Sequence, residues 1–440
     1  MKKHTQSPYE SSKVSYKPSG IEWLGEIPQS WENVSIRSCF TESNQRCNTD
    51  SYPLLSVTIA NGIIYQDNIE NKKDISNDDK SNYKIVPLNA VAYNKMRMWQ
   101  GAVGVNTLTT GIVSPAYIVA IPNEKILPNF VSYLFKSKIM IGEFDKNSYG
   151  LCLDMNNLRY DDFRNIKIPL PPLQEQKEIA EFLDSKCEKI QNYIDKKQKL
   201  ITLLQEKKQA LINEAVTKGL NPNIESKNSG IEYLGLIPHH WEVKKLKYVG
   251  KVVLGKMLCN EHQKGYSHCY YLKSKNLQWL NVEVSQIEKM WFSEYEKSLY
   301  RIKKDDLLVS EGGEVGKTCI WNNELAECYI QNSVHKITLN KFNNAKFFLY
   351  LFFTYGKLGV FDSVVSRVSI AHLVLEKLVN VDMVVPPLQE QKQIANFLDE
   401  KCEKINSAIE KTKRQITLIK EYKNTLINEA VCGRINLERK

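Results

Sequence analysis

Two stretches of the chain carry apolar residues at alternating spacings of four and three. In the first stretch the seam positions are Leu183, Cys187, Ile190, Ile194, Lys197, Ile201, Leu204, Lys208, Leu211 and Ala215. The second stretch repeats these spacings from Leu398 to Ala430, and eight of the ten seam positions are apolar in each stretch. Such a heptad seam predicts a long helix with one apolar stripe. Paired prolines, at 171–172 and 386–387, fit the two helix starts, where a missing N–H costs nothing.

A lone helix of this length needs a partner for its apolar stripe. Each stretch holds about 43 residues, which make a rod of roughly 65 Å. The chain supplies one other helix of the same length, so we predict that the two pair with each other, antiparallel, under a pseudo-two-fold axis. The alternative is that each helix pairs with another protein.

Two inserts precede the helices and have a different pattern. Apolar runs at Ala116–Ile121 and Val334–Leu339 predict strands, whereas Asn129–Phe135 and Ala345–Leu351 predict short buried helices. Each insert spans about 140 residues, a normal single-domain size. We therefore expect two mixed α/β domains.

The chain contains one internal duplication. Residues 19–32 return as 229–242 with ten of fourteen positions identical, and 171–190 return as 386–405 with seventeen of twenty identical. The hexapeptide Leu211–Val216 returns unchanged as Leu426–Val431. Between these blocks the two inserts share almost no identity. A repeated frame thus holds two divergent inserts.

The predicted fold class is α+β, with two α/β domains joined by two long antiparallel helices that form a coiled coil. The expected boundaries are a mobile tail at 1–18, a first domain at 19–170, a long helix with a linker at 171–228, a second domain at 229–385 and a second long helix at 386–440.

Composition adds three limits to this picture. The 440 residues include 60 Lys and Arg against 50 Asp and Glu, a net charge of +10 that suits a polyanionic partner without requiring one. No apolar run is long enough to span a bilayer, and the polar N-terminus predicts no signal peptide. Ten cysteines without a Cys-x-x-Cys pair are too few for a disulfide scaffold. We expect a cytoplasmic protein with reduced thiols and no membrane partner.

No catalytic, metal or cofactor site can be assembled from the sequence. The segment Glu311–Thr318 resembles a P-loop, but Glu311 stands where that motif needs glycine, and a strand is expected after Thr318. The spacing of Cys259, His262, His268 and Cys269 fits no zinc pattern. Asp184 with Lys186, and Asp195 with Lys197, are reminiscent of nuclease pairs but fall on the solvated faces of a predicted helix. The Asn-Pro-Pro-aromatic motif of adenine methyltransferases does not occur in the sequence.

The repeated frame resembles the specificity subunit of type I restriction–modification enzymes. Leu-Gln-Glu-Gln opens each long helix, at 173–176 and 388–391, and Gly-Ile-Glu-(Trp/Tyr)-Leu-Gly-x-Ile-Pro-x-x-Trp precedes each insert. The resemblance covers residues 19–440. It implies two target-recognition domains, each reading half of a split sequence in double-stranded DNA. It also implies that the helices dock two methyltransferase (modification) subunits, with restriction/translocase subunits joining afterwards. The chain itself would then be non-catalytic, and S-adenosylmethionine, ATP and Mg would be bound by the partners.

Candidate DNA contacts come from polar, basic and aromatic loops in the inserts. Residues 33–170 carry 15 basic and 13 acidic residues, and residues 243–385 carry 20 and 14, so the second insert is the more basic. In Asn94–Gly101, Arg97 and Gln100 are candidate base contacts and Lys95 a candidate phosphate contact. By order along the chain Ser310–Lys317 corresponds to this loop. The remaining candidates are Lys317 for a phosphate, and Asn147, Tyr149, Ser366 and Arg367.

Three other interpretations stay open. Any one of these loops can be an ordinary solvated loop. A coiled-coil scaffold that binds protein through its inserts would explain the helices and the duplication, but not the basic excess of the second insert. A self-contained nuclease or methyltransferase is disfavoured by the missing motifs.

Overall fold

The computed structural model describes residues 15–47, 52–69, 80–150, 156–364 and 372–435. The chain divides into two compact units. Unit 1 contains residues 1–197 and 414–440, and unit 2 contains residues 198–413. Each unit therefore combines one insert with parts of both long helices, a division that cuts across the helices instead of following their ends.

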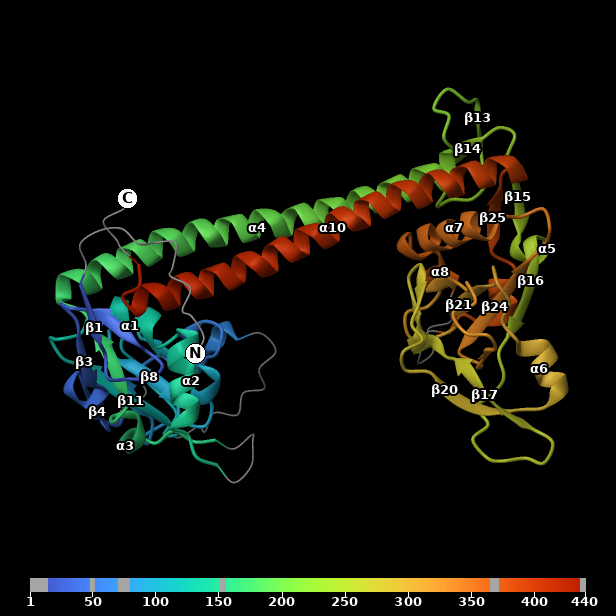
Figure 1. Cartoon of the computed structure of the whole chain (residues 1–440). Coiled ribbons are helices and arrows are strands. Elements are labelled where there is room, and N and C mark those ends of the chain that lie inside the picture. Colours follow the sequence, from blue (N-terminus) through green and yellow to red (C-terminus); the bar gives the residue numbers. More distant parts are fainter. Residues whose placement is uncertain (1–14, 48–51, 70–79, 151–155, 365–371, 436–440) are drawn as a thin grey trace, which may run out of the picture. The chain divides into compact units, whose positions relative to one another are not determined.

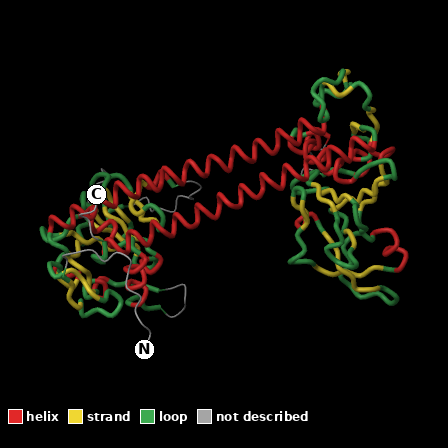
Figure 2. Tube along the Cα trace, turned by 45° about the horizontal axis from the view of Figure 1, so that its top comes forward, coloured by secondary structure: helices red, strands yellow, loops and turns green. Residues whose placement is uncertain are grey.

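The two predicted long helices are present. They are α4 (Leu173–Lys218) and α10 (Leu388–Val431), and each is continuous from end to end (Figure 2). Most seam positions are buried and the rest are half-buried, whereas the residues between them are mostly exposed. The heptad prediction is confirmed, and α4 runs three residues past Ala215, the last seam position. The expected end of the second long helix at 440 is wrong, because α10 ends at Val431.

The helices pair antiparallel within each unit. In unit 1 the end of α10, at Ala430 and Val431, shares an apolar core with Ile179 and Leu183 near the start of α4 (Figure 1). Unit 2 has the reverse combination, in which the end of α4 shares a core with the start of α10. Lys208 Nζ also donates to Asn406 Oδ1 at 2.9 Å. The predicted antiparallel coiled coil is confirmed.

The insert of unit 1 is built around a four-stranded antiparallel sheet in the order β4-β11-β8-β9. The strands β3 and β12 pair beside α4, and the pairs β5–β6 and β7–β10 complete the insert. The bounds are β3 Glu32–Ser35, β4 Phe40–Ser43, β5 Leu55–Thr58, β6 Gly62–Tyr65, β7 Lys84–Val86, β8 Val91–Asn94, β9 Val103–Val105, β10 Gly111–Val113, β11 Tyr117–Pro122, α1 Pro128–Leu134, α2 Lys138–Lys146, α3 Tyr160–Phe163 and β12 Lys167–Leu170.

The insert of unit 2 has a sheet of the same order, β16-β24-β21-β22, with additional strands beside it. The bounds are β15 Glu242–Lys245, α5 Leu246–Val249, β16 Gly250–Leu254, β17 Ser267–Leu272, β18 Leu277–Gln278, β19 Asn281–Val282, β20 Glu288–Phe292, α6 Glu294–Tyr300, β21 Leu307–Ser310, β22 Thr318–Ile320, β23 Tyr329–Ile330, β24 Val334–Leu339, α7 Ala345–Lys357, α8 Val360–Val364, α9 Leu375–Leu378 and β25 Asp382–Val385. Two inserts with almost no sequence identity thus share one sheet topology.

The predicted short elements are present with small shifts in their bounds. The strands expected at Ala116–Ile121 and Val334–Leu339 are β11 and β24, and the following apolar segments form α1 and α7. The segment after the glycine-rich loop is the strand β22, as predicted. Consecutive residues are buried in β11, β22 and β24, so burial does not alternate along these strands.

Each copy of the frame begins with a small hairpin that sequence analysis missed. The strands β1 (Tyr16–Pro18) and β2 (Glu26–Pro28) pair in unit 1, and β13 (Ser226–Asn228) and β14 (Leu236–Pro238) pair in unit 2. The tail prediction is therefore wrong for Tyr16–Pro18, and residues 1–14 lie outside the described residues. Three-residue strands have too little pattern to be found from sequence, because backbone pairing and not side-chain burial makes them.

Two general findings concern the described residues. No helix in this part of the chain is long and apolar enough to cross a membrane. Most of the described cysteines are buried.

Candidate nucleic-acid interface

One buried glutamine attaches each insert to a long helix. Gln176, in the first turn of α4, accepts a hydrogen bond from Leu127 N at 2.8 Å and donates to Lys125 O at 3.0 Å and Pro171 O at 2.8 Å. Gln391 occupies the same position in α10, where it accepts from Asn344 N at 2.7 Å and donates to Pro386 O at 2.8 Å. Neither side chain is exposed to solvent. The segment before α1 and the segment before α7 are therefore fixed to the helices in the same way.

A tyrosine–aspartate hydrogen bond repeats this attachment about two turns further along each long helix. Tyr133 donates to Asp184 Oδ1 at 2.5 Å in unit 1, and Tyr350 donates to Asp399 Oδ1 at 2.8 Å in unit 2. Burial, together with the neighbouring Asp184, raises the pKa of Tyr133, so the phenol stays protonated as the donor. Asp184, which resembled part of a nuclease pair in the sequence, is thus a structural acceptor.

The loop Asn94–Gly101, here named loop A, joins β8 to β9 and is held by its own backbone. Arg97 O accepts hydrogen bonds from Gln100 N at 3.0 Å and Ala102 N at 3.1 Å, and the Met98 side chain is fully buried as an anchor. Gly101 ends the loop at φ +89, a left-handed conformation that favours glycine. Arg97 and Gln100 remain exposed. The loop therefore presents its two candidate base contacts on a fixed backbone.

The structure brings the other candidates of the first insert beside loop A. Leu158 N donates to Lys95 O at 2.8 Å, and the neighbouring Asn157 forms a two-way backbone bridge with Tyr149. Asn147 caps the end of α2, which packs on loop A through Ile141 against Gly101. Tyr149 is 66% exposed. Lys95, Arg97, Gln100, Asn147 and Tyr149 thus belong to one surface region, although their DNA contacts remain predictions.

The loop Ser310–Lys317, here named loop B, joins β21 to β22 and is the topological equivalent of loop A. Lys317 Nζ lies 2.8 Å from Glu314 Oε2, and its side chain is only 17% exposed. A phosphate would therefore have to compete with Glu314 for this ammonium group. The predicted phosphate contact stays a prediction, and the ion pair is a feature that the sequence did not indicate.

The two remaining candidates, Ser366 and Arg367, lie outside the described residues. In β24, the Nε2–H of His335 donates to the Leu373 carbonyl oxygen at 2.7 Å, and Nδ1 has no partner among the described residues. Burial lowers the pKa of His335, so the ring is held neutral inside the insert. It is a core residue and offers nothing to a ligand.

The histidine and cysteine cluster of unit 2 is arranged around a tryptophan. His268 stacks on Trp291 with ring centroids 4.7 Å apart, and His262 meets the same ring edge-on at 4.6 Å. Within the described ranges no three His, Cys, Asp or Glu residues gather as a metal site would require. The rings are therefore engaged in aromatic packing.

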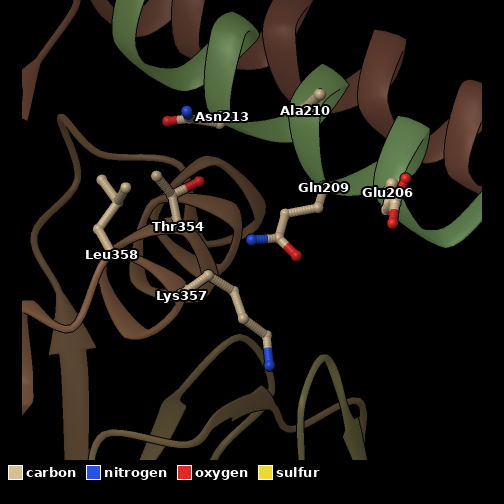
Figure 3. Close-up of a pocket in the computed structure, with 7 residues that line it drawn as sticks. All are labelled: Glu206, Gln209, Ala210, Asn213, Thr354, Lys357 and Leu358. Atoms are coloured by element: carbon tan, nitrogen blue, oxygen red, sulfur yellow. The ribbon is translucent and has the colours of Figure 1, made fainter.

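A pocket of about 300 Å³ lies in unit 2 between α4 and α7. Figure 3 shows its walls, which are lined by Glu206, Gln209, Ala210, Asn213, Thr354, Lys357 and Leu358. The Thr354 hydroxyl is buried here without a hydrogen-bond partner among the described residues. The lining has no pair of groups suited to acid–base or nucleophilic catalysis.

Comparisons with known proteins agree with one another. The family model described as "Type I restriction modification DNA specificity domain" matches residues 28–203 and again 238–418. The type I restriction enzyme MjaVIII specificity subunit of Methanocaldococcus jannaschii is 27% identical, over 74% of this chain and 75% of its own length.

Two solved structures show the same fold. A chain of a type I R-M system, from work on its assembly and conformational transition, superposes with a TM-score of 0.68 at 16% identity, covering 93% of this chain and 99% of its own. The HsdS subunit from Thermoanaerobacter tengcongensis gives a TM-score of 0.54 at 17% identity, covering 93% and 98%. With a family model that matches both copies of the frame, the chain belongs to the DNA specificity subunits of type I restriction–modification systems.

Proposed function

We propose that this chain reads a two-part DNA target, with one part recognised by each insert. The observation that carries the proposal is the shared sheet order β4-β11-β8-β9 and β16-β24-β21-β22, which places loop A and loop B at equivalent positions. The side chains on these loops differ completely, and Gln176 and Gln391 attach both inserts in the same way. One scaffold with two different loops suits two different half-sites.

The proposal assigns no chemistry to the chain itself. The described residues of both inserts present loops and buried anchors, and the pocket beside α7 lacks catalytic pairs. Methyl transfer and cleavage are assigned to partner subunits, which would bind S-adenosylmethionine, ATP and Mg. The basic excess of the second insert, with 20 basic and 14 acidic residues at 243–385, supports contact with phosphates.

An exchange of the second insert tests the two-part reading. The complex of this chain with its methyltransferase subunits is prepared with residues 243–385 replaced by the insert of a relative. Sequencing of the methylated sites should show one half of the target changed and the other half intact. A change in both halves would contradict separate reading by the two inserts.

Equivalent exposed leucines on the helices support the docking of two identical partners. Leu203 of α4 and Leu418 of α10 occupy matching positions of the repeat, 215 residues apart, and are 51% and 64% exposed. Both lie outside the seam, where a solvated helix face would carry polar residues. We infer that each leucine lies at the centre of one methyltransferase contact, because a repeated surface binds repeated copies of a partner.

Single charge substitutions test this docking. Leu203→Glu or Leu418→Glu should each reduce the bound methyltransferase subunits from two to one, and the double variant should bind none, as measured by native mass spectrometry. Gln205→Glu, at an exposed position two residues beyond Leu203 and therefore on a different side of the helix, is the matched control for one added negative charge. Two subunits bound to the double variant would contradict the assignment of these leucines.

A further inference from the structure

Each recognition loop is supported by a neighbouring hairpin. Hairpin A is β5–β6, and hairpin B is β18–β19. Hairpin A lies against β9, where a Cβ on Gly104 would stand 2.7 Å from Ile63 N. Hairpin B lies against β22, where Leu280 N donates to Thr318 O at 2.9 Å. The strands β9 and β22 hold the same edge position in the two sheets, so the hairpins occupy equivalent places.

In unit 1 a single lysine joins hairpin A to loop A. Lys136 follows α1, and its Nζ donates to Thr58 O at 3.2 Å and Ile59 O at 2.7 Å, both at the tip of hairpin A. The same ammonium group donates to Gly101 O at 3.0 Å, at the end of loop A. All three acceptors are main-chain carbonyls. Lys136 therefore uses its full set of three donors to fix two backbones.

In unit 2 a tryptophan makes the corresponding connection. Trp279 stands at the tip of hairpin B, and its indole N–H donates to Glu314 of loop B. Its ring packs on α7, with centroids 5.7 Å from Phe353, and the Lys357 ammonium lies 5.1 Å from its centre. Figure 3 shows Lys357 extending from α7 away from α4. Glu314 in turn pairs with Lys317 at 2.8 Å. The contact thus continues from hairpin B into loop B.

The two connections join the same three elements by different chemistry. In each unit they link a hairpin tip, the helical segment after the long central strand, and the loop that carries candidate DNA contacts. We propose that Lys136 and Trp279 are positioning residues, which hold loop A and loop B in the conformation that reads DNA without touching DNA themselves. This inference rests on the proposed function.

Two costs in the structure support a positioning role. Burial lowers the pKa of Lys136 to about 8, so the folded unit keeps an ammonium group in a place that disfavours its charge. Leu280, beside Trp279, has φ +67, a left-handed conformation that is unfavourable for leucine. An apolar residue at 136 or a glycine at 280 would avoid these costs. Strained or costly groups that persist next to a recognition loop indicate a functional constraint.

Recognition of each half of the target tests the inference. The complex with the methyltransferase subunits is prepared with Lys136→Met, and its preference at every target position is measured by sequencing methylated sites from a random library. Preference in the half read by the first insert should fall about fivefold to tenfold, the loss expected when one base contact loosens. The other half should be unchanged. Lys138→Met, which removes an exposed charge two residues away, should change neither half.

A second variant addresses unit 2 without weakening a helix. A Cβ added by Gly356→Ala in α7 would overlap the Trp279 ring, while alanine itself favours the helix. This variant should relax only the half read by the second insert. Gly142→Ala in α2, where a Cβ would meet nothing within 4 Å, is the matched control.

A pH profile separates positioning from general stability. The three partners of Lys136 are uncharged carbonyls, and burial, without a charged neighbour, lowers the pKa of its ammonium group. Sequence preference in the half of the target read by the first insert should therefore weaken as pH rises through about 8. The Lys136→Arg variant, whose side chain stays charged, should keep this preference above pH 8.

These experiments distinguish a failure of the positioning role from a failure of two-part DNA reading. If Lys136→Met and Gly356→Ala leave both halves as sharp as in the wild type, or relax both halves equally, the positioning role is overturned while two-part reading stands. A wild-type complex that methylates without any sequence preference overturns the proposed function, and this inference with it.

Discussion

The junction between lead-in and helix differs between the two copies of the frame. In the first copy Trp31 Nε1 donates to Glu175 Oε2 at 2.6 Å, and Ser30 donates to Oε1 of the same carboxylate at 3.0 Å. In the second copy His240 Nε2 lies 2.7 Å from Glu390 Oε2, and the buried Trp241 Nε1 has no partner among the described residues.

Both tryptophans nevertheless fill the same place in their units. Trp31 and Trp241 are almost fully buried, and each lies against the glycine that ends a long helix, Gly433 and Gly219 respectively. The comparison teaches that the shape of the junction is shared while its hydrogen bonding is not. An unpaired buried N–H lowers stability, so the second junction should be the weaker one.

Substitution of the two tryptophans should give the largest difference in stability loss between the units. Trp31→Phe removes the hydrogen bond and leaves Glu175 without this donor, whereas Trp241→Phe removes an N–H that has no partner. The cavity cost is common to both, so Trp31→Phe should destabilise its unit by about 1–3 kcal/mol more than Trp241→Phe. The stability loss of each unit is measured by hydrogen exchange, at β12 for unit 1 and at β25 for unit 2. Equal losses would show that both indoles have acceptors in solution.

Substitution of the glycines that end the long helices should give a smaller difference in stability loss between the units. Gly433 and Gly219 have φ +73 and +76, so alanine at either position costs about 1 kcal/mol from backbone conformation alone. A Cβ at 433 would stand 2.5 Å from Pro28 Cδ, whereas at 219 its nearest neighbour is the flexible Glu390 carboxylate at 3.1 Å. Urea unfolding followed by the same exchange probes should therefore show a larger loss for Gly433→Ala. A larger loss for Gly219→Ala would mean that Glu390 cannot move.

Lowering the pH should gradually reduce the stability of unit 2 by a small amount that unit 1 does not share. His335 is buried in unit 2 with a lowered pKa, and the strand registers place Ile118 at the equivalent position of unit 1. Below about pH 6.5 the unfolded chain binds a proton that folded His335 binds weakly, so the stability of unit 2 is complete above that pH and falls as pH decreases. His335→Ile should remove this dependence, as measured by thermal unfolding across the acid range. An unchanged slope in the variant would assign the acid sensitivity to other groups.

At alkaline pH the stability of unit 1 should also rise with increasing pH. Folded Lys136 has a pKa of about 8, lower than an ordinary lysine, so the unfolded chain binds the proton more tightly between that pH and about 10.5. Its contribution to the stability of unit 1 therefore rises with pH through this window and is lowest below it. Lys136→Met should flatten the dependence of the stability of unit 1 on pH. Thermal unfolding, with hydrogen exchange at β12, measures this dependence. A steeper curve in the variant would contradict burial as the cause.

The parts of the fold that could be predicted are those encoded by local pattern. The heptad seam and the paired prolines predicted α4 to within three residues of each end, because spacing defines a long amphipathic helix. The second long helix was expected to reach 440, but α10 ends at Val431. Apolar runs predicted β11, β24, α1 and α7 for a similar reason. The hairpin strand Tyr16–Pro18 was assigned to the tail, since its stability comes from pairing with a distant segment.

The site was predictable only in part, for a related reason. Loop A stood out because polar, basic and aromatic residues interrupt apolar runs, and loop B was matched to it by order along the chain. Nothing in the sequence marked Lys136, an ordinary lysine between two helices, because its three carbonyl partners are brought together only by tertiary structure. The pairing of Lys317 with Glu314 was hidden in the same way, as was the place of Trp279.

The glutamine attachment has a consequence for how such chains diversify. The bonds of Gln176 all end on main-chain atoms, and so do the two shortest bonds of Gln391. An attachment that recognises backbone atoms is indifferent to the side chains of the segment it holds. Sequence drift, or recombination that brings in an insert from another gene, can then replace nearly every residue of a reader without detaching it. The near absence of identity between the two inserts, beside a frame with strongly matched blocks, is the outcome that such an attachment permits.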